Sequence, residues 1–178
     1  MSVTQFRFSG FGGQGVIMMG MILGRAATIH HGMNATLTQS FGPEARGGSA
    51  ATAVLIDKDP ILYPYVLQAD VLVAMSQEAF RKYVPTLNEN GILIYEEELV
   101  KPGDLPKGVK KYSIPATKLA EEMGRKMVAN IVMTGFMAAV LPYVPADAMR
   151  KAMLESVPRG TEELNGKAFD KGFNYSRL

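Results

Sequence analysis

The sequence predicts an α/β domain with a mostly parallel β-sheet and one strand that pairs antiparallel or at an edge. Two observations lead to this fold class. Short runs of β-forming residues alternate with segments in which apolar residues recur at helical spacing. The run 70–75 is apolar after its first residue, which is typical of a central parallel strand. With 178 residues the chain can bury a proper core, so we expect one domain over residues 1–178.

The first half of the chain predicts three strands and one long helix. Residues 3–8 are rich in β-forming side chains, and 14–31 carry apolar residues at helical spacing up to Gly32. Strands follow at 34–38 and 49–57. The connection between these two strands is too short for a crossover helix, so we expect an antiparallel or edge pairing there.

The second half alternates between strands and helices and then becomes helical. Ser76 can cap a helix over 77–87, because its hydroxyl can accept a hydrogen bond from an amide of the first turn. Aromatic residues in the tail 164–178 are expected to pack on the body of the domain or on a partner. The remaining predicted elements are strands at 92–95 and 110–114, a loop at 96–111, and helices at 117–124, 128–141 and 146–155.

The composition excludes several classes of function. Lys and Arg total 19 against 17 acidic residues, with no basic run and no interleaved aromatic stripe, so we expect no nucleic-acid binding. The apolar runs fall short of the roughly 20 residues that span a bilayer. The first residues lack the charged and apolar regions of a signal peptide. We therefore expect a cytoplasmic protein that does not enter a membrane.

The counts of cysteine and histidine limit the chemistry of the chain. The absence of cysteine excludes disulfides, thiolate catalysis and cysteine-ligated iron–sulfur clusters within it. The only histidines, His30 and His31, are adjacent at the end of the first predicted helix, so a metal site is not expected. No serine has an evident base, and Gly103-Asp104-Leu105 lacks the second glycine of a thiamine diphosphate motif. We expect no catalytic residue in this chain.

A glycine-rich turn joins the first strand to the first helix. Gly10, Gly12 and Gly15 match the spacing G-x-G-x-x-G, in which backbone amides and a helix N-terminus can bind phosphate. A dinucleotide site of this kind also needs an acidic residue roughly 20 positions further on. Residues 1–43 contain no acidic residue. NAD(P) binding is therefore disfavoured, and a tight turn packed close to a neighbouring chain is favoured.

A second unusual stretch, TQSFGPEARGGS at 38–49, follows the second strand. Like the glycine turn it comes at the carboxyl end of a strand, so we expect the two to be neighbours at the edge where ligands and partners collect. Arg46 is the best candidate for contacting an anion, because its guanidinium matches a carboxylate or a phosphate. A local ion pair between Arg46 and Glu44 is the alternative.

The sequences GFGGQGV at 10–16 and QSFGPEARGGS at 39–49 resemble the gamma subunit, or gamma domain, of the 2-oxoacid:ferredoxin oxidoreductases. The likeness covers nearly the whole chain and implies a Rossmann-like, three-layer domain packed beside the active site of alpha and beta subunits. It implies that this chain alone binds no cofactor. Thiamine diphosphate, magnesium and iron–sulfur clusters would lie in those subunits or in a small ferredoxin-like delta subunit. The implied reaction oxidatively decarboxylates a 2-oxoacid, transfers the acyl group to coenzyme A and reduces ferredoxin.

The resemblance also implies which residues contact coenzyme A or a neighbouring subunit. The loop sequence is closer to the 2-oxoglutarate and branched-chain lineages than to the pyruvate lineage, and we choose 2-oxoglutarate. Pyruvate or a branched-chain 2-oxoacid, a stand-alone dinucleotide-binding protein and a purely structural subunit remain open. The apolar motif surface predicts a homodimer when partners are absent. The contact residues implied are Gly10, Gly12, Gly13, Gln14, Gly15, Gln39, Ser40, Glu44, Arg46 and Gly47.

Overall fold

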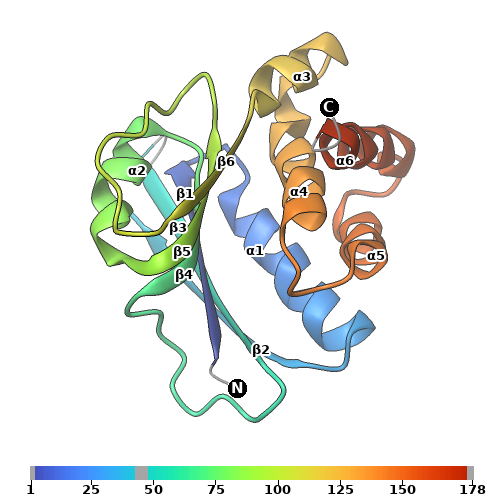
Figure 1. Ribbon diagram of the computed structural model, residues 1–178. Helices are drawn as coiled ribbons and strands as arrows, with labels where there is room; N and C mark the ends of the chain where they lie inside the picture. Colours follow the sequence, from blue (N-terminus) through green and yellow to red (C-terminus); the bar gives the residue numbers. More distant parts are fainter. Residues whose placement is uncertain (1–2, 43–47, 176–178) are drawn as a thin grey trace.

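The computed structural model describes residues 3–42 and 48–175, and a six-stranded sheet of order β2-β3-β1-β4-β5-β6 forms its centre (Figure 1). β4 is parallel to β1 and β5, and β5 is parallel to β6. β3 runs antiparallel to both β1 and β2, which confirms the antiparallel pairing expected between the second and third strands. The strands are β1 (Thr4–Phe11), β2 (Asn34–Phe41), β3 (Ser49–Asp57), β4 (Ala69–Ala74), β5 (Leu87–Glu96) and β6 (Lys110–Ile114).

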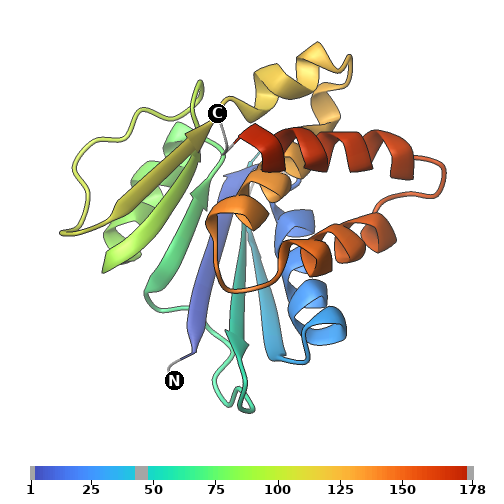
Figure 2. The ribbon, with the colours of Figure 1, turned by 45° about the vertical axis from the view of Figure 1, so that its right-hand side comes forward.

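Helices cover the two faces of the sheet unequally, in the three-layer arrangement that the sequence predicts. One face carries α1 and α4, with α5 and α6 outside them, and the opposite face carries α2 (Figures 1 and 2). None of the described helices is long and apolar enough to cross a membrane. The helices are α1 (Val16–Arg25), which continues as a π-helical turn (Ala26–His30), α2 (Gln77–Tyr83), α3 (Ala116–Glu122), α4 (Ala129–Val140), α5 (Ala146–Ser156) and α6 (Glu162–Tyr175).

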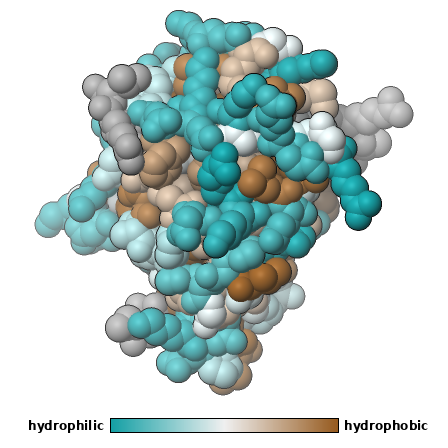
Figure 3. Space-filling view, turned by 90° about the vertical axis from the view of Figure 1, so that its right-hand side faces the viewer, coloured by the Kyte–Doolittle hydropathy of each residue, from teal (hydrophilic) through white to brown (hydrophobic). Residues whose placement is uncertain are grey.

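The main core lies between the sheet and the helices on the α1 side. Phe6 and Phe8 of β1 are fully buried there, together with Met19 and Ile22 of α1. Two smaller apolar clusters lie elsewhere, one around Phe80 of α2 and one around Leu55, Val66 and Ala69. The outer helices present mostly hydrophilic side chains to solvent (Figure 3).

Several strands are longer than their local sequence predicts. β1 and β2 were expected to end at 8 and 38, but both continue pairing with β3, through Phe11 opposite Ser49 and Phe41 opposite Ala50. The expectation that a loop begins at 39 is therefore wrong. A hydrogen-bonded partner strand can hold glycine and polar residues in extended conformation despite their weak β-propensity.

The helix expected over 77–87 is also shorter, because its end belongs to the sheet. α2 stops at Tyr83, a 3₁₀ turn containing Pro85 follows, and β5 begins at Leu87 with a pairing to Ala69 of β4. Residues 88–91, between the expected helix and the expected strand at 92–95, are thus part of β5, whose pairing with β4 has an irregularity in register. Proline cannot donate a backbone hydrogen bond, which explains why the regular helix ends before it.

The tail contains a helix that the sequence analysis did not predict. α6 packs on α4 and buries Ala168 and Phe169. The aromatic side chain of Phe169 thus packs on the body of the domain, one of the two outcomes expected for the tail. Gly135 of α4 and Gly172 of α6 allow this contact, because a Cβ on either glycine would meet backbone atoms of the facing helix. The surface of α4 on which α6 packs forms only in the folded domain, so the sequence alone did not indicate it.

Candidate functional site

The glycine turn follows β1 at the carboxyl edge of the sheet. Gly13 and Gly15 have φ values of 95° and 71°, a left-handed conformation that side chains rarely adopt. Gly10 lies within β1, where a Cβ would stand 2.9 Å from the Cβ of Met75. The motif glycines thus serve both the turn and its close packing on β4.

Gln14 fastens the turn to the sheet. Its Oε1 accepts a hydrogen bond of 2.7 Å from the amide of Phe11, and its Nε2 donates one of 2.8 Å to the carbonyl of Met75. Both ends of the carboxamide are therefore engaged within the fold. Gln14 therefore has a positioning role: it fixes the glycine turn, so that the backbone of the turn is held in place for a ligand or a neighbouring chain.

Asn130 supports the turn from the α4 side. The side chain is buried and lies against Gly15, so closely that a Cβ on Gly15 would overlap it. Its Nδ2 donates to the sulfur of Met18 at 3.6 Å, a weak acceptor. These contacts indicate that Asn130 steadies the glycine turn.

The β2–β3 hairpin brings the second motif beside the first. The amide of Gly12 donates to the carbonyl of Gly48 at 2.7 Å, and the amide of Gly42 donates to the carbonyl of Ser49 at 2.6 Å. The expectation that the two motifs are neighbours is confirmed for these residues. Glu44, Arg46 and Gly47, which were expected in the same site, lie outside the described residues.

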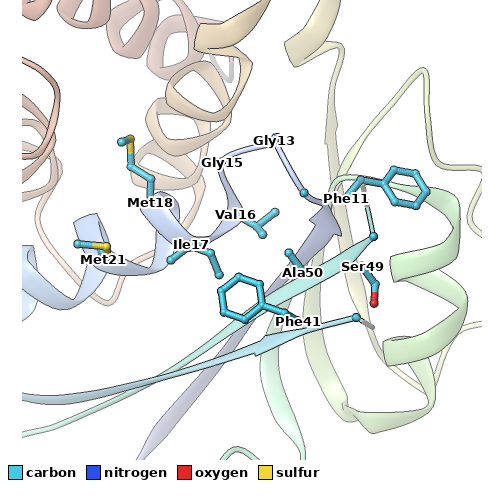
Figure 4. Close-up of a pocket in the computed structure, with 13 residues that line it drawn as sticks. Phe11, Gly13, Gly15, Val16, Ile17, Met18, Met21, Phe41, Ser49 and Ala50 are labelled. Carbon is cyan, nitrogen blue, oxygen red and sulfur yellow. The ribbon is translucent and has the colours of Figure 1, made fainter. Parts of the chain in front are cut away.

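Between the glycine turn, α1 and the end of the hairpin lies a groove of about 740 Å³ (Figure 4). Its described walls are apolar or backbone and include no charged side chain. The side chain of Phe41 is 66% exposed at its rim, too open for an ordinary core residue, whereas the ring of Phe11 points away from the groove (Figure 4). We call this cavity the motif groove. Its side-chain walls are Val16, Ile17, Met18, Met21, Phe41 and Ala50, and the backbone of Phe11 and Ser49 borders it.

The start of α1 adds hydrogen-bond donors to the motif groove. At this end of the helix the amide of Met19 donates a hydrogen bond of 3.1 Å to the carbonyl of Gly15. The amides of Val16, Ile17 and Met18 precede it and have no acceptor within the helix. The first turn contains no acidic residue, so its partial positive charge is not offset locally. The groove can therefore bind an apolar group that ends in a carbonyl or an anion.

The structure separates Gln39 and Ser40 from the motif groove. Both lie on β2 and line a different cavity, together with Arg7 and Tyr65. The side chain of Ser40 is on the opposite face of the sheet, whereas Gln39 shares the face of Phe41 but is not among the residues that line the groove. Side chains alternate between faces along a strand, so the neighbouring Phe41 points to the groove while Ser40 does not. Among the expected site residues that the structure describes, Ser40 thus lies on the other face of the sheet from the glycine turn.

The sequence analysis undervalued the apolar walls of the groove. Of the methionines early in the first helix, Met19 is fully buried in the core. Met21, in contrast, is 43% exposed and lines the groove with Met18. The group Met18, Met19 and Met21 covers more than one side of a helix, which was the signal that one of them faces outward.

The groove offers binding groups and no catalytic pair. Ser49 has no histidine beside it, because His30 lies at the far end of the first helix and pairs with Glu155 at 3.1 Å. Among the described residues no group of three or more His, Asp or Glu side chains could hold a metal ion. The arrangement can position a ligand or a partner chain beside chemistry carried out elsewhere.

Comparison with known proteins identifies the family of this chain. Residues 5–175 match the family described as pyruvate ferredoxin/flavodoxin oxidoreductase. The chain is 45% identical over 175 residues to the 2-oxoglutarate synthase subunit KorC of Methanocaldococcus jannaschii, covering 97% of this chain and 94% of that protein. The motifs described above lie within both matches.

Solved structures agree with this assignment. The gamma subunit of a keto/oxoacid ferredoxin oxidoreductase from Geobacter sulfurreducens matches with a TM-score of 0.85 and 39% identity, over 98% of each chain. The 2-oxoglutarate:ferredoxin oxidoreductase of Magnetococcus marinus, solved with 2-oxoglutarate, coenzyme A and succinyl-CoA bound, shares the fold. Its TM-score is 0.87 at 22% identity, over 99% of this chain and 31% of that one. The chain therefore belongs to the pyruvate ferredoxin/flavodoxin oxidoreductase family.

Proposed function

We propose that this chain is the gamma subunit of a 2-oxoacid:ferredoxin oxidoreductase complex whose substrate is 2-oxoglutarate. The observation that carries the proposal is the 45% identity to a 2-oxoglutarate synthase subunit, which extends over nearly all of both chains. In this reaction the complex decarboxylates 2-oxoglutarate, passes the acyl group to coenzyme A and reduces ferredoxin. Alpha and beta subunits, and a ferredoxin-like delta subunit, are the proposed partners, and the proposed location is the cytoplasm.

The redox and thiamine cofactors belong to the partner subunits in this proposal. The chain has no cysteine to ligate an iron–sulfur cluster. Its Asp104 is followed by a leucine, which does not fit the metal-binding motif that accompanies thiamine diphosphate. When bound in the partner subunits, these groups supply the decarboxylation and the electron transfer. This chain contributes binding surface.

The motif groove is the proposed contact for coenzyme A beside the active site. The pantetheine arm of coenzyme A is a slender chain that alternates apolar segments with amide carbonyls. Apolar walls such as Phe41 and Met21 can pack against the apolar segments, and the backbone amides at the start of α1 can donate hydrogen bonds to the carbonyls. Arg46, two positions before Gly48, is proposed to bind a phosphate of the same ligand through its guanidinium fork.

A pull-down of the tagged chain from its native cytoplasm, followed by mass spectrometry, tests membership in the complex. Recovery of thiamine- and cluster-bearing chains supports the proposal, and assays of that material with each 2-oxoacid identify the substrate. A preference for pyruvate or a branched-chain 2-oxoacid would replace 2-oxoglutarate. Recovery of the chain alone with NAD(H) would overturn the subunit role and favour the dinucleotide alternative.

Kinetics of the assembled complex test the contact with coenzyme A. Arg46→Ala and Phe41→Ala are each expected to raise the KM for coenzyme A about tenfold or more, with little change in the KM for the 2-oxoacid. Ile29→Ala is a matched control, because Ile29 is also exposed, at 61%, but lies at the far end of the first helix. Unchanged kinetics in both groove variants would leave a purely structural subunit as the better description.

A further inference from the structure

In the part of the chain that the structure describes, one face of the sheet carries no helix over β3 and β2. α2 lies over β4, β5 and β1: its Phe80 packs against Leu72 and Leu93, and its Tyr83 lies against Arg7 of β1. On the same side of the sheet, β3 packs against the segment 61–67, through Val66 and Ile61, and none of the described helices lies over β3 or β2. Figures 1 and 2 show α2 on this side of the sheet, near β4 and β5. A sheet face without a covering layer is unusual in a three-layer fold, because both faces of its strands are built to be buried.

The uncovered strands, together with β1, present a row of small side chains around one cation. Thr38 of β2, Ala53 of β3 and Arg7 of β1 lie side by side across the three strands, as their register shows. Together with Ser40 and Tyr65 they line a cavity of about 200 Å³. The small neighbours leave the guanidinium of Arg7 accessible from this cavity.

Arg7 lacks a counter-ion among the residues that the structure describes. Its Nη2 donates to the carbonyl of Val66 at 2.7 Å, and its Cζ lies 4.7 Å from the ring centroid of Tyr83. Its Nε is buried without a hydrogen-bond partner, and no described carboxylate lies within 4.0 Å of the side chain. A guanidinium has five N–H donors, so a partly buried one with a single acceptor has unused capacity for a carboxylate.

The segment that borders this cavity exposes a concentration of large apolar side chains. Leu62 is 95% exposed and Leu67 is 68% exposed, and Tyr63 and Tyr65 stack edge to face at 5.6 Å between them. Aromatic residues around an arginine are the composition that interfaces favour. We call the surface formed by Arg7, Thr38, Ser40, Tyr63, Tyr65 and Leu67 the open-face patch.

We propose that the open-face patch is an assembly interface that receives an acidic side chain of a different subunit, set among apolar residues, against Arg7. The inference rests on the proposed role as a subunit of a complex. A second copy of this chain does not fit, because a two-fold contact of the patch with itself would bring Arg7 toward Arg7 without an acid among the patch residues. The patch and the motif groove lie on opposite faces of the same strands, so both can be occupied at once.

Photo-crosslinking in the assembled complex tests the location of the interface. A photoreactive phenylalanine analogue in place of Tyr65 is expected to crosslink to a partner subunit, at a segment containing Asp or Glu. The same analogue in place of Ile29, which is similarly exposed on the α1 side, is expected to give no such product. Crosslinking of Tyr65 to a second copy of this chain, or its failure to crosslink in a complex that is otherwise intact, would overturn the inference. Failure to recover any partner would instead count against the proposed function.

Substitutions test whether the positive charge of Arg7 contributes to binding of the partner subunit. Arg7→Met keeps much of the aliphatic stem but removes the charge, and it is expected to weaken association with the partner about 30-fold or more, as losing one member of an interfacial charge pair does. Arg7→Lys should retain part of the affinity. Leu67→Asp, on an exposed residue, should also weaken association at least about tenfold. Thermal unfolding of each isolated variant separates loss of fold from loss of association. Normal affinity of a folded Arg7→Met variant would exclude the acidic contact.

Discussion

The side chain of Gln14 hydrogen bonds the carbonyl of Met75, 61 positions further along the chain, and so ties the glycine turn to the end of β4. The same carboxamide accepts from the amide of Phe11. The single side chain of Gln14 thus stabilises the carboxyl edge of the sheet, where the motif groove lies. The turn depends on this contact as much as on its glycines.

Gln14→Leu is expected to lower the free energy of unfolding by about 1–3 kcal/mol, because it leaves backbone groups of Phe11 and Met75 without their partners. Equilibrium denaturation in urea measures the change. Gln77→Leu is the matched control: Gln77 also makes two side-chain hydrogen bonds, to the backbone of Lys101, but in an exposed position. Equal losses in the two variants would contradict the special role of Gln14.

Gly15→Ala is expected to destabilise the fold more than Gly13→Ala. Both glycines have positive φ, which costs alanine about 1–2 kcal/mol. A Cβ at Gly13 would meet no atom within 4 Å, whereas a Cβ at Gly15 would overlap Asn130. With Gly13→Ala as the control, we therefore expect Gly15→Ala to lower the free energy of unfolding by at least about 1 kcal/mol more. Equal costs in thermal or urea unfolding would show that Asn130 moves away freely.

Gly172→Ala tests the contact between α4 and α6. A Cβ there would overlap the carbonyl of Val132. We therefore expect the substitution to lower the free energy of unfolding by about 3 kcal/mol, although alanine is a better helix former than glycine. Gly166→Ala in the same helix meets only the flexible end of Arg150, at 3.4 Å, and should be neutral or stabilising by up to about 1 kcal/mol. Urea unfolding of the pair measures the difference. A stabilised Gly172→Ala variant would exclude the close helix contact.

The pKa of Glu122 is lowered by its hydrogen bond and charge interaction with Lys171, and the pKa of Glu163 is lowered in the same way by Lys167. Each folded-state pKa lies below the ordinary value, so each pair contributes stability above that value and loses it as the pH falls through the lowered pKa. Lys171→Met should raise the pKa of Glu122 and leave that of Glu163 unchanged, and Lys167→Met should do the reverse. Carboxyl titration followed by NMR measures both. A shift of both groups in either variant would indicate a rearrangement of α6.

The sequence predicted the elements whose pattern is local. The first helix, the apolar strand at β4 and the short helix after Ser76 each follow from a periodicity or a cap within a few residues. The Ser76 hydroxyl accepts from the amide of Ala79 at 3.2 Å, as such a cap should. The glycine turn was located in the same way, because the turn conformation itself requires glycine at positive φ.

Contacts between distant segments decided the rest. α6 has apolar residues too few and too separated to be predicted by itself, and its helix depends on burial of Phe169 against α4. The lengths of β1 and β2 depend on β3, which pairs with each of them to the hairpin end. Residues that need a partner to adopt their structure cannot be assigned before the partner is placed.

By itself the sequence determined the family-specific motifs, the absence of cysteine chemistry and the order of most elements, because these are properties of residues and short spacings. Only the tertiary structure decided what the motif residues do. It engaged Gln14 within the fold, joined Gly12 to Gly48, and placed Ser40 and Phe41 on opposite faces of the sheet. The physical reason is that strand pairing and alternation determine which face a side chain reaches, and both depend on segments far apart in the chain.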